Sequence, residues 1–299
     1  MKKKILTALG CIALLCSCEP MNESNYWTGN VFLHADWKDG NLETGRRPIS
    51  IDSCFIGIYS HDDNVDGVIT NFPKDNAELE LKQGVYDFMV FHNTKYIKRT
   101  EMYKTAVVEL PTMYNEEKEQ VVVENPNEML YAGLALNDTV KNDIRTAFRV
   151  NVIRLLKKIN FIVVVGDKKE LTENIHMNIS GVANRLKIWN QKVDTSDEAV
   201  ILFDLKKRGR HLNNENFLTS YQGSAYVLGI TGRNILYMTF TDGDGKERLV
   251  KLNLTKYLSD WDTEEVTVRM FINVWDSNNA DVVIKGWELG NTTDVIFDY

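Results

Sequence analysis

Residues 62–69, with the sequence Asp-Asp-Asn-Val-Asp-Gly-Val-Ile, are the stretch whose residue types and spacing best suit metal chemistry. Oxygen-bearing side chains stand at its first, third and fifth positions and Gly67 at its sixth, as in the first half of a calcium loop. The twelfth position of such a loop supplies a bidentate glutamate, but here it is Pro73. A solvated turn between strands is therefore the main interpretation of Asp62–Gly67, and a looser Ca²⁺ site is the alternative.

Other catalytic and metal-binding patterns are missing from the sequence. It contains no G-x-S-x-G elbow, no glycine-rich phosphate loop and no cysteine ligand set. The histidines stand singly, without the H-x-x-x-H spacing of a metal site. Two carboxylates could meet in space as a glycosidase pair, but among 42 acidic residues chance proximity is expected. We therefore predict no cofactor, no metal and no enzymatic activity. The histidines are His34, His61, His92, His176 and His211.

The first residues carry a different kind of chemistry. Lys2–Lys4 precede a short apolar run, Ile5–Cys16, which is typical of an export signal and is too short to span a bilayer. Leu15-Cys16-Ser17-Cys18 resembles the bacterial lipobox, in which a small residue before an obligatory cysteine directs lipidation of that cysteine. We expect a signal peptide over residues 1–17 and a diacylglyceryl thioether with an N-acyl chain on Cys18. Several acyl chains make such an anchor effectively permanent. A plain signal peptide with an incidental cysteine is the alternative.

Processing leaves one free thiol. Cys11 and Cys16 leave with the leader and Cys18 carries the lipid, so Cys54 remains alone and no intramolecular disulfide can form. Cys54 lies between Ser53 and Phe55 in a strand-like run, where a small buried apolar residue is expected, not a nucleophile.

Most of the mature chain has the pattern of short β-strands. Runs of β-branched and aromatic residues, many with period two, are separated by turn residues such as Pro73, Gly84, Pro111 and the Asp242–Gly245 turn. Long helical patterns do not occur between them, and only 167–174 and 254–260 are expected to be helical. An all-β chain of antiparallel sandwiches is predicted. The strand-like runs are 31–37, 49–59, 68–72, 77–81, 85–91, 105–110, 120–124, 129–136, 147–155, 159–165, 175–179, 186–189, 199–205, 225–230, 234–241, 247–252, 266–275, 282–287 and 295–297.

The length favours two domains after a tether. Residues 19–25 form a short polar segment that contains Pro20, which suits a flexible link, and we place the tether at 18–29. We place an N-terminal β-sandwich at 30–139 and a C-terminal one at 140–299, with the seam in the polar segment 137–142. The formal net charge of −7 argues against nucleic acid as a partner. No transmembrane helix is expected in the mature chain.

The tryptophans offer a second binding chemistry, because indole rings stack on sugars. In β-sandwiches, however, a tryptophan is more often a core or edge residue, and we expect that role for most of these. The tryptophans are Trp27, Trp37, Trp189, Trp261, Trp275 and Trp287.

Taken in order, these features resemble the fimbrillin-type surface lipoproteins of Bacteroides and their relatives, in the branch of fimbrial anchor and accessory subunits. The resemblance covers most of the mature chain and rests on pattern and order. The residues that carry it are the lipobox, Ala35–Trp37, the strand that follows Pro48 and ends Phe55–Tyr59, Gly84–Phe88, Ile179–Ala183 and Leu236–Gly245.

The resemblance implies two tandem transthyretin-like, Greek-key β-sandwiches, held by lipid at the outer membrane and exposed at the cell surface. It also implies a non-enzymatic role in assembling or terminating a fimbria, or in adhesion, with fimbrial subunits as partners. In such systems one subunit adds a strand to its neighbour, and main-chain hydrogen bonds provide affinity. A glycan-binding lipoprotein of a polysaccharide uptake system is the alternative function, and a hydrolase is the third hypothesis.

Overall fold

The computed structural model describes residues 28–39, 42–43, 54–62, 67–72, 75–92, 95–142, 144–169, 171, 174–194, 198–213, 216–259, 263–274 and 281–289. Within these ranges the chain is almost entirely β-structure, so the predicted all-β class is confirmed. The helix α2 (Thr255–Leu258) is one turn long and lies in the predicted range 254–260. The helix expected at 167–174 is not formed in the described part of that range, because Asp167 ends a strand and a bend follows.

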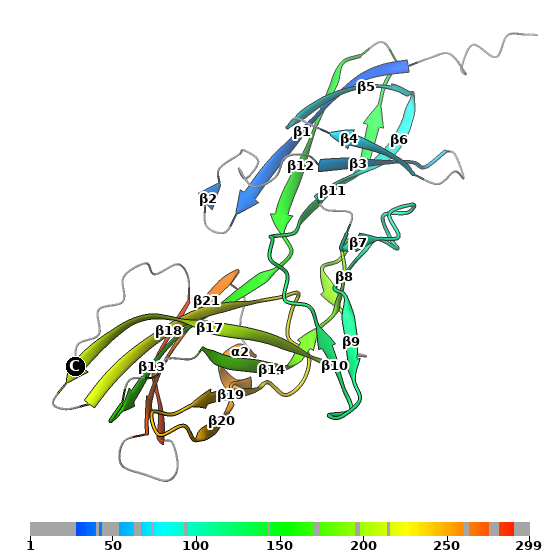
Figure 1. The fold of residues 1–299 in the computed structure, drawn as a ribbon. Coiled ribbons are helices and arrows are strands. Elements are labelled where there is room, and N and C mark those ends of the chain that lie inside the picture. Colours follow the sequence, from blue (N-terminus) through cyan, green and yellow to red (C-terminus); the bar gives the residue numbers. More distant parts are fainter. Residues whose placement is uncertain are drawn as a thin grey trace, which may run out of the picture.

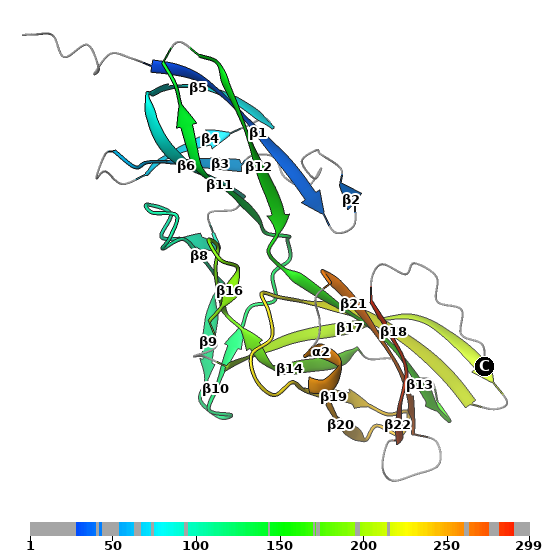
Figure 2. The ribbon, with the colours of Figure 1, turned by 180° about the vertical axis from the view of Figure 1, so that it is seen from behind.

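Figure 1 shows two β-modules stacked end to end, and the reverse view in Figure 2 agrees. The first module is an eight-stranded sheet that curls into two layers. Its strands are β1 (Thr28–Asp39), β2 (Leu42–Glu43), β3 (Cys54–Ser60), β4 (Val68–Phe72), β5 (Asn76–Lys82), β6 (Gly84–Phe91), β11 (Tyr131–Val140) and β12 (Thr146–Arg154).

Strand β1 illustrates why these residues form this module. Val31, Leu33, Ala35 and Trp37 alternate along it and are all buried, while the residues between them are partly exposed. Successive side chains of a strand point to opposite faces, so this alternation gives β1 one apolar face. That face packs on the second layer, where the ring of Trp37 meets Tyr131 edge-on with centroids 5.9 Å apart.

The second module is a ten-stranded sheet that also forms two layers. Its strands are β9 (Thr112–Asn115), β10 (Gln120–Val123), β13 (Lys157–Asp167), β14 (Ile175–Ala183), β17 (Glu198–Asn213), β18 (Asn216–Val227), β19 (Ile235–Thr241), β20 (Glu247–Asn253), β21 (Glu265–Asn273) and β22 (Asp281–Leu289).

The long strand β17 belongs to both layers of this module. Its first half, as far as Leu205, pairs with β14 and β10, and its second half, from Lys206, pairs with β18. A register shift between Lys207 and Gly209 follows the change of partner. Bulges increase twist and bend a strand, so β17 can pass from one layer to the other around a common core.

Most strand pairs are antiparallel, as predicted. Among the described strands, three pairs are parallel: β1 with β12, β13 with β21, and β10 with β17. Parallel neighbours need a crossover connection, and in this chain each pair joins strands that are far apart in sequence.

The modules meet at a small four-stranded sheet of β7 (Ile97–Lys98), β8 (Val107–Glu109), β15 (Arg185–Lys187) and β16 (Lys192–Val193). A partly buried ion pair also crosses the junction, with 2.9 Å between Arg154 of β12 and Glu265 of β21. The strands β11 and β12, on either side of the expected seam, both belong to the first sheet. The chain leaves this sheet after Arg154, the last residue of β12. The domain limits themselves stay a prediction.

Candidate functional site

The structure describes the two ends of the Asp62–Gly67 segment, and the residues between them lie outside the described part. The N–H of Gly67 donates to the carbonyl of Glu101 at 2.7 Å. A Cβ on Gly67 would lie 2.2 Å from the ring of Tyr59, so this position needs glycine. Burial, reinforced by the carboxylate of Glu101, raises the pKa of Tyr59. Among the described residues, no group of three His, Cys, Asp or Glu could hold a metal ion. The Ca²⁺ alternative therefore stays a prediction.

Each histidine that has a described side-chain partner lies beside a single polar group, and these histidines do not come together in one site. His176 lies 2.7 Å from the carboxylate of Asp204 on the outer face of the second module. In the first module, His61 lies 2.8 Å from Oδ2 of Asp87, and the N–H of Asn137 donates to Oδ1 of the same carboxylate at 2.8 Å.

This buried Asp87 fixes an irregularity in β11. Asn137 has a φ of 60° and lies in the register shift between Ala135 and Asp138. Burial raises the pKa of Asp138, and the negative charge of Asp87 raises it further. The cluster of Asp87, Asn137 and Asp138 stabilises the bulge in β11, and its geometry does not resemble a catalytic site.

The described tryptophans differ in accessibility. Trp37 is fully buried in the first core, which is the structural role expected of it. Trp189 is 46% exposed in the turn between β15 and β16. Trp27, Trp261 and Trp275 lie outside the described residues, as does the proposed lipid site Cys18, and only the backbone of Trp287 is described.

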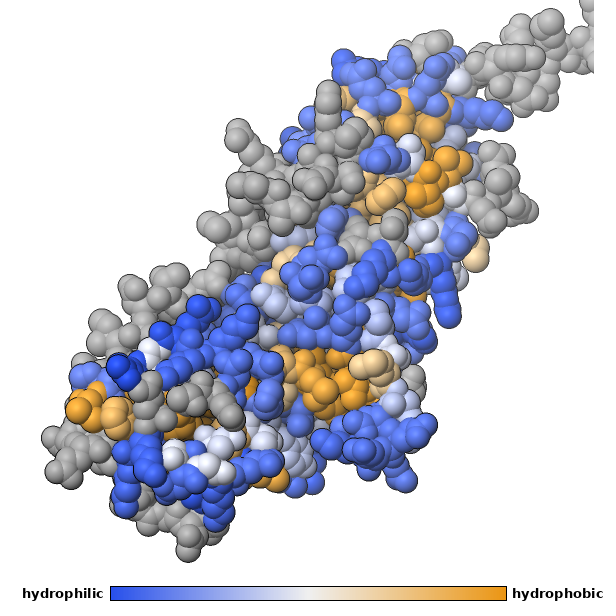
Figure 3. Space-filling view, viewed as in Figure 1, coloured by the Kyte–Doolittle hydropathy of each residue, from blue (hydrophilic) through white to orange (hydrophobic). Residues whose placement is uncertain are grey.

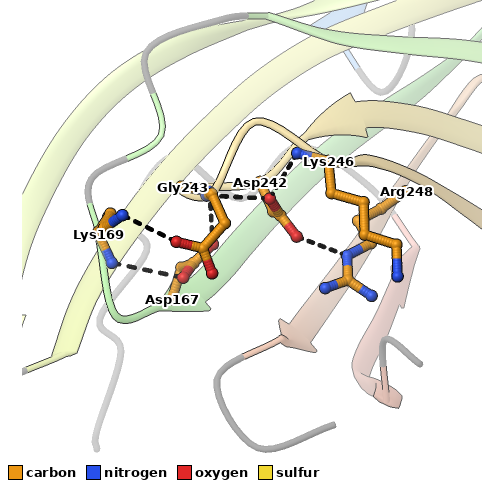
Figure 4. A network of polar contacts seen from close by, with 7 residues as sticks. Asp167, Lys169, Asp242, Gly243, Lys246 and Arg248 are labelled. Carbon is orange, nitrogen blue, oxygen red and sulfur yellow. Dashed lines mark hydrogen bonds and ion pairs between the residues drawn. The ribbon is translucent and has the colours of Figure 1, made fainter. Parts of the chain in front are cut away.

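The predicted Asp242–Gly245 turn connects β19 to β20 and is attached to the end of β13 (Figure 4). The N–H of Gly243 donates to Asp167 at 2.9 Å, and Lys169 donates to Asp244 at 2.8 Å. Because β13 belongs to one layer of the second module and β19 to the other, this polar network joins the two layers. Its role is structural.

The remaining candidate site is a set of edge strands that expose apolar side chains. In the first module β4 pairs with β3, and Val68 and Ile69 on it are exposed. In the second module β9 pairs with β10, and Met113 and Tyr114 on β9 are 73% and 63% exposed. An open edge carrying apolar side chains is a template for a further strand.

Sequence reasoning missed β9, because residues 112–115 were left between the strand-like runs 105–110 and 120–124. The available signal was weak: an apolar pair between Pro111 and a run of glutamates. Exposure of that pair on a sheet edge depends on which distant strand pairs with β10, and this was not visible in the sequence.

A cleft of about 690 Å³ lies at the junction of the modules. Apolar residues make up more than half of its lining, and the charged residues in it are Arg154, Lys157, Lys192 and Glu264. It is partly open to solvent, and it lies beside the turn that carries Trp189.

Two stacked β-modules with apolar side chains exposed on edge strands place the chain among the all-β proteins built from tandem β-modules. The sequence profile of the fimbrillin-A associated anchor proteins Mfa1 and Mfa2 matches residues 59–293, and the chain belongs to this family. The predicted resemblance is thereby confirmed. Comparison with curated proteins gave no match.

Solved structures show the same fold. A candidate adhesin of Bacteroides thetaiotaomicron has a TM-score of 0.59 and 15% identity, over 86% of this chain and 96% of that one. The fimbrial anchor protein Mfa2 of Porphyromonas gingivalis has a TM-score of 0.52 and 11% identity, over 87% and 96%. A candidate polysaccharide-binding protein of B. thetaiotaomicron has a TM-score of 0.55 and 12% identity, over 88% and 98%. At these identities the likeness concerns the fold alone.

Proposed function

We propose that this protein is a non-enzymatic fimbrial anchor or accessory subunit at the cell surface, which acts in assembly or adhesion by binding a partner through β-strand complementation. The observation that carries the proposal is the family match over residues 59–293. Each of β4 and β9 has one edge that no described strand pairs with, and such an edge is a physical means of binding, since an added strand gains main-chain hydrogen bonds along its whole length.

The proposed anchor is the lipid on Cys18, which holds the protein at the outer membrane. Strand β1 begins at Thr28, so the segment after Cys18 is short and polar, as a tether requires. In the described part of the chain, no helix has the length and apolar character needed to cross a bilayer.

Palmitate labelling of producing cells tests the anchor. Wild-type protein should incorporate label and fractionate with the outer membrane, and the Cys18→Ala variant should do neither. Labelling that persists in Cys18→Ala would refute this lipid site. The matched control is Cys54→Ala, since the buried Cys54 should leave labelling unchanged.

Capture of fimbriae tests the function. Immobilised full-length protein should retain fimbriae purified from the cells that produce it, and the complex should survive high salt because main-chain pairing is not screened by ions. If the purified fimbriae do not bind, the fimbrial proposal is wrong.

Glycan binding is the second candidate function, favoured by the exposed Trp189 beside the junction cleft. A glycan array would support it if Trp189→Ala abolished a signal that Tyr257→Ala, a change at another exposed aromatic residue, left intact. An array without signal would remove this candidate.

A further inference from the structure

The main chain of β9 has one edge committed to β10 and one edge facing outward. The N–H of Glu124 donates to the carbonyl of Pro111 at 2.9 Å, and Met113 is opposite Val122 in the register. In an antiparallel ladder, hydrogen-bonded and non-hydrogen-bonded pairs alternate. The N–H and C=O of Met113 therefore point toward β10, and those of Tyr114 point away from it. Among the described residues, no strand pairs with that outward edge.

The side chains along this edge present apolar surface on both faces. Met113 lies on the same face of the sheet as Val122 and, through it, Val200 of β17; Val122 and Val200 are buried, and Met113 is exposed. Leu202, two residues further along β17, continues this face and is exposed. Figure 3 shows apolar surface in the part of the molecule where β9, β10 and β17 meet. The neighbouring Tyr114 points to the other face and is also exposed.

The turn after β9 gives this surface a charge. Residues 116–119 read Glu-Glu-Lys-Glu, and all four are exposed. A strand that lies against β9 has one end beside this acidic turn, so basic residues at that end would complement it.

We propose that the outward edge of β9 is the surface at which this protein accepts a strand from its partner. The occupant is an extended segment of another protein, with apolar side chains that meet Met113 and Tyr114 and with lysine or arginine at the end beside residues 116–119. This inference rests on the proposed function and names the edge and the chemistry of the partner. In Figures 1 and 2, β9 lies in the module farther from the start of β1, and so away from the proposed membrane tether.

The variant Tyr114→Pro provides a sharp test. Proline removes the N–H that points outward and leaves the hydrogen bonds to β10 in place, and edge strands tolerate it. A matched control lies at the opposite edge of the same layer. The N–H of Leu254 donates to the carbonyl of Asn234, so the same alternation turns the N–H of Leu249 on β20 outward. Leu249 is 67% exposed, comparable with Tyr114.

Two probes are used with the full chain: fimbriae purified from the producing cells, and a synthetic peptide of two lysines followed by alternating valine and threonine. We expect Tyr114→Pro to weaken binding of both by about tenfold or more, the size of losing one well-formed hydrogen bond and its neighbouring contacts. Leu249→Pro should bind like wild type. Met113→Asp should weaken the binding of both probes without changing the hydrogen-bonding groups of the main chain. Glu117→Gln should weaken the binding of the peptide and make that binding less dependent on salt.

The outcomes separate the two proposals. If wild-type protein captures no fimbriae, the proposed function fails. If it captures fimbriae and both Tyr114→Pro and Met113→Asp capture them equally well, the function stands and the β9 site is wrong. Equal losses in Tyr114→Pro and Leu249→Pro would also overturn the site. The proposed partner would also be wrong if Tyr114→Pro changed only the self-association of this protein, because the occupant of the β9 edge would then be a second copy of this chain.

Discussion

Replacing Asp242 by asparagine should weaken the second module by removing a charge that several donors share. Oδ1 of Asp242 accepts the N–H groups of Asp244 at 3.0 Å and Lys246 at 2.9 Å, and Oδ2 accepts Nε of Arg248 at 2.7 Å (Figure 4). The side chains of Asp242 and Arg248 are 4% and 12% exposed, so water screens this pair poorly.

The magnitude follows from which bonds survive. The amide oxygen of an asparagine can still accept from the two backbone N–H groups. Its NH₂ group then faces Nε of Arg248, so a charge-assisted hydrogen bond becomes a contact between two donors. A hydrogen bond to a charged group contributes about 1.5–3 kcal/mol. We therefore expect Asp242→Asn to lower the free energy of unfolding of the second module by about 2–3 kcal/mol.

The effect should depend on pH. Burial disfavours the charged form of Asp242, but hydrogen bonds from Lys246, Arg248 and Asp244 outweigh burial and lower its pKa. A group whose pKa is lowered by folding stabilises the protein above its unfolded pKa, about 3.9 for aspartate, and this stability is lost as pH falls through the folded pKa. Asparagine does not titrate. The difference between wild type and Asp242→Asn should thus be constant from pH 7 to about pH 5 and shrink below about pH 4.

Hydrogen exchange read at the amides of β19 and β20 measures this module without requiring the whole chain to unfold in one step. The matched control is Asp244→Asn, two residues away, because the ion pair between Asp244 and Lys169 is largely exposed. Exposed pairs contribute little, so this variant should behave like wild type at every pH. Equal effects of the two substitutions, or a difference that persists unchanged at pH 3, would refute the reasoning.

Three further predictions concern the first module. Trp37→Ala should lower its unfolding free energy by about 3–5 kcal/mol in urea titration, because Trp37 is fully buried against Tyr131. Gly133→Ala should lower the free energy of unfolding by about 1–3 kcal/mol, since its Cβ would collide with the carbonyl oxygen of Asn151. A melting point equal to that of wild type would contradict this close approach. Cys54 should not react with a thiol reagent in the native protein and should react fully in guanidinium, and rapid native labelling would contradict its burial.

Local patterns were enough to predict much of the fold. The pattern of residues 31–37 predicted the strand β1, and the glycines that hairpin turns need predicted the Asp242–Gly245 turn between β19 and β20. Strand β6 shows the limit. Phe88 and Val90 pack in the same core as Trp37 of β1. Met89 and Phe91 pack in the core that continues into the second module, so the strand is buried on both faces. An apolar run of this kind has no period that reveals which neighbour covers each face.

The candidate site was less predictable, for a related reason. Lipidation of Cys18 depends on a short linear pattern, so it could be proposed from the sequence. The β9 surface depends on the parallel pairing of β10 with the first residues of β17. These residues are far from β10 in the sequence. No local property of Met113 or Tyr114 shows whether the strand that contains them is central or at an edge.

The position of β1 in the fold suits a strand attached to the membrane. Val31–Lys38 are paired with β12 on one edge, and Thr28–His34 are paired with β5 on the other. A pull directed along β1 would load the hydrogen bonds of both ladders together instead of opening them one at a time. The burial of β6 on both faces and the ion pair between Arg154 and Glu265 then connect this module to the one that carries β9. Load between the proposed lipid and a strand bound at β9 would then pass through this core packing and this ion pair.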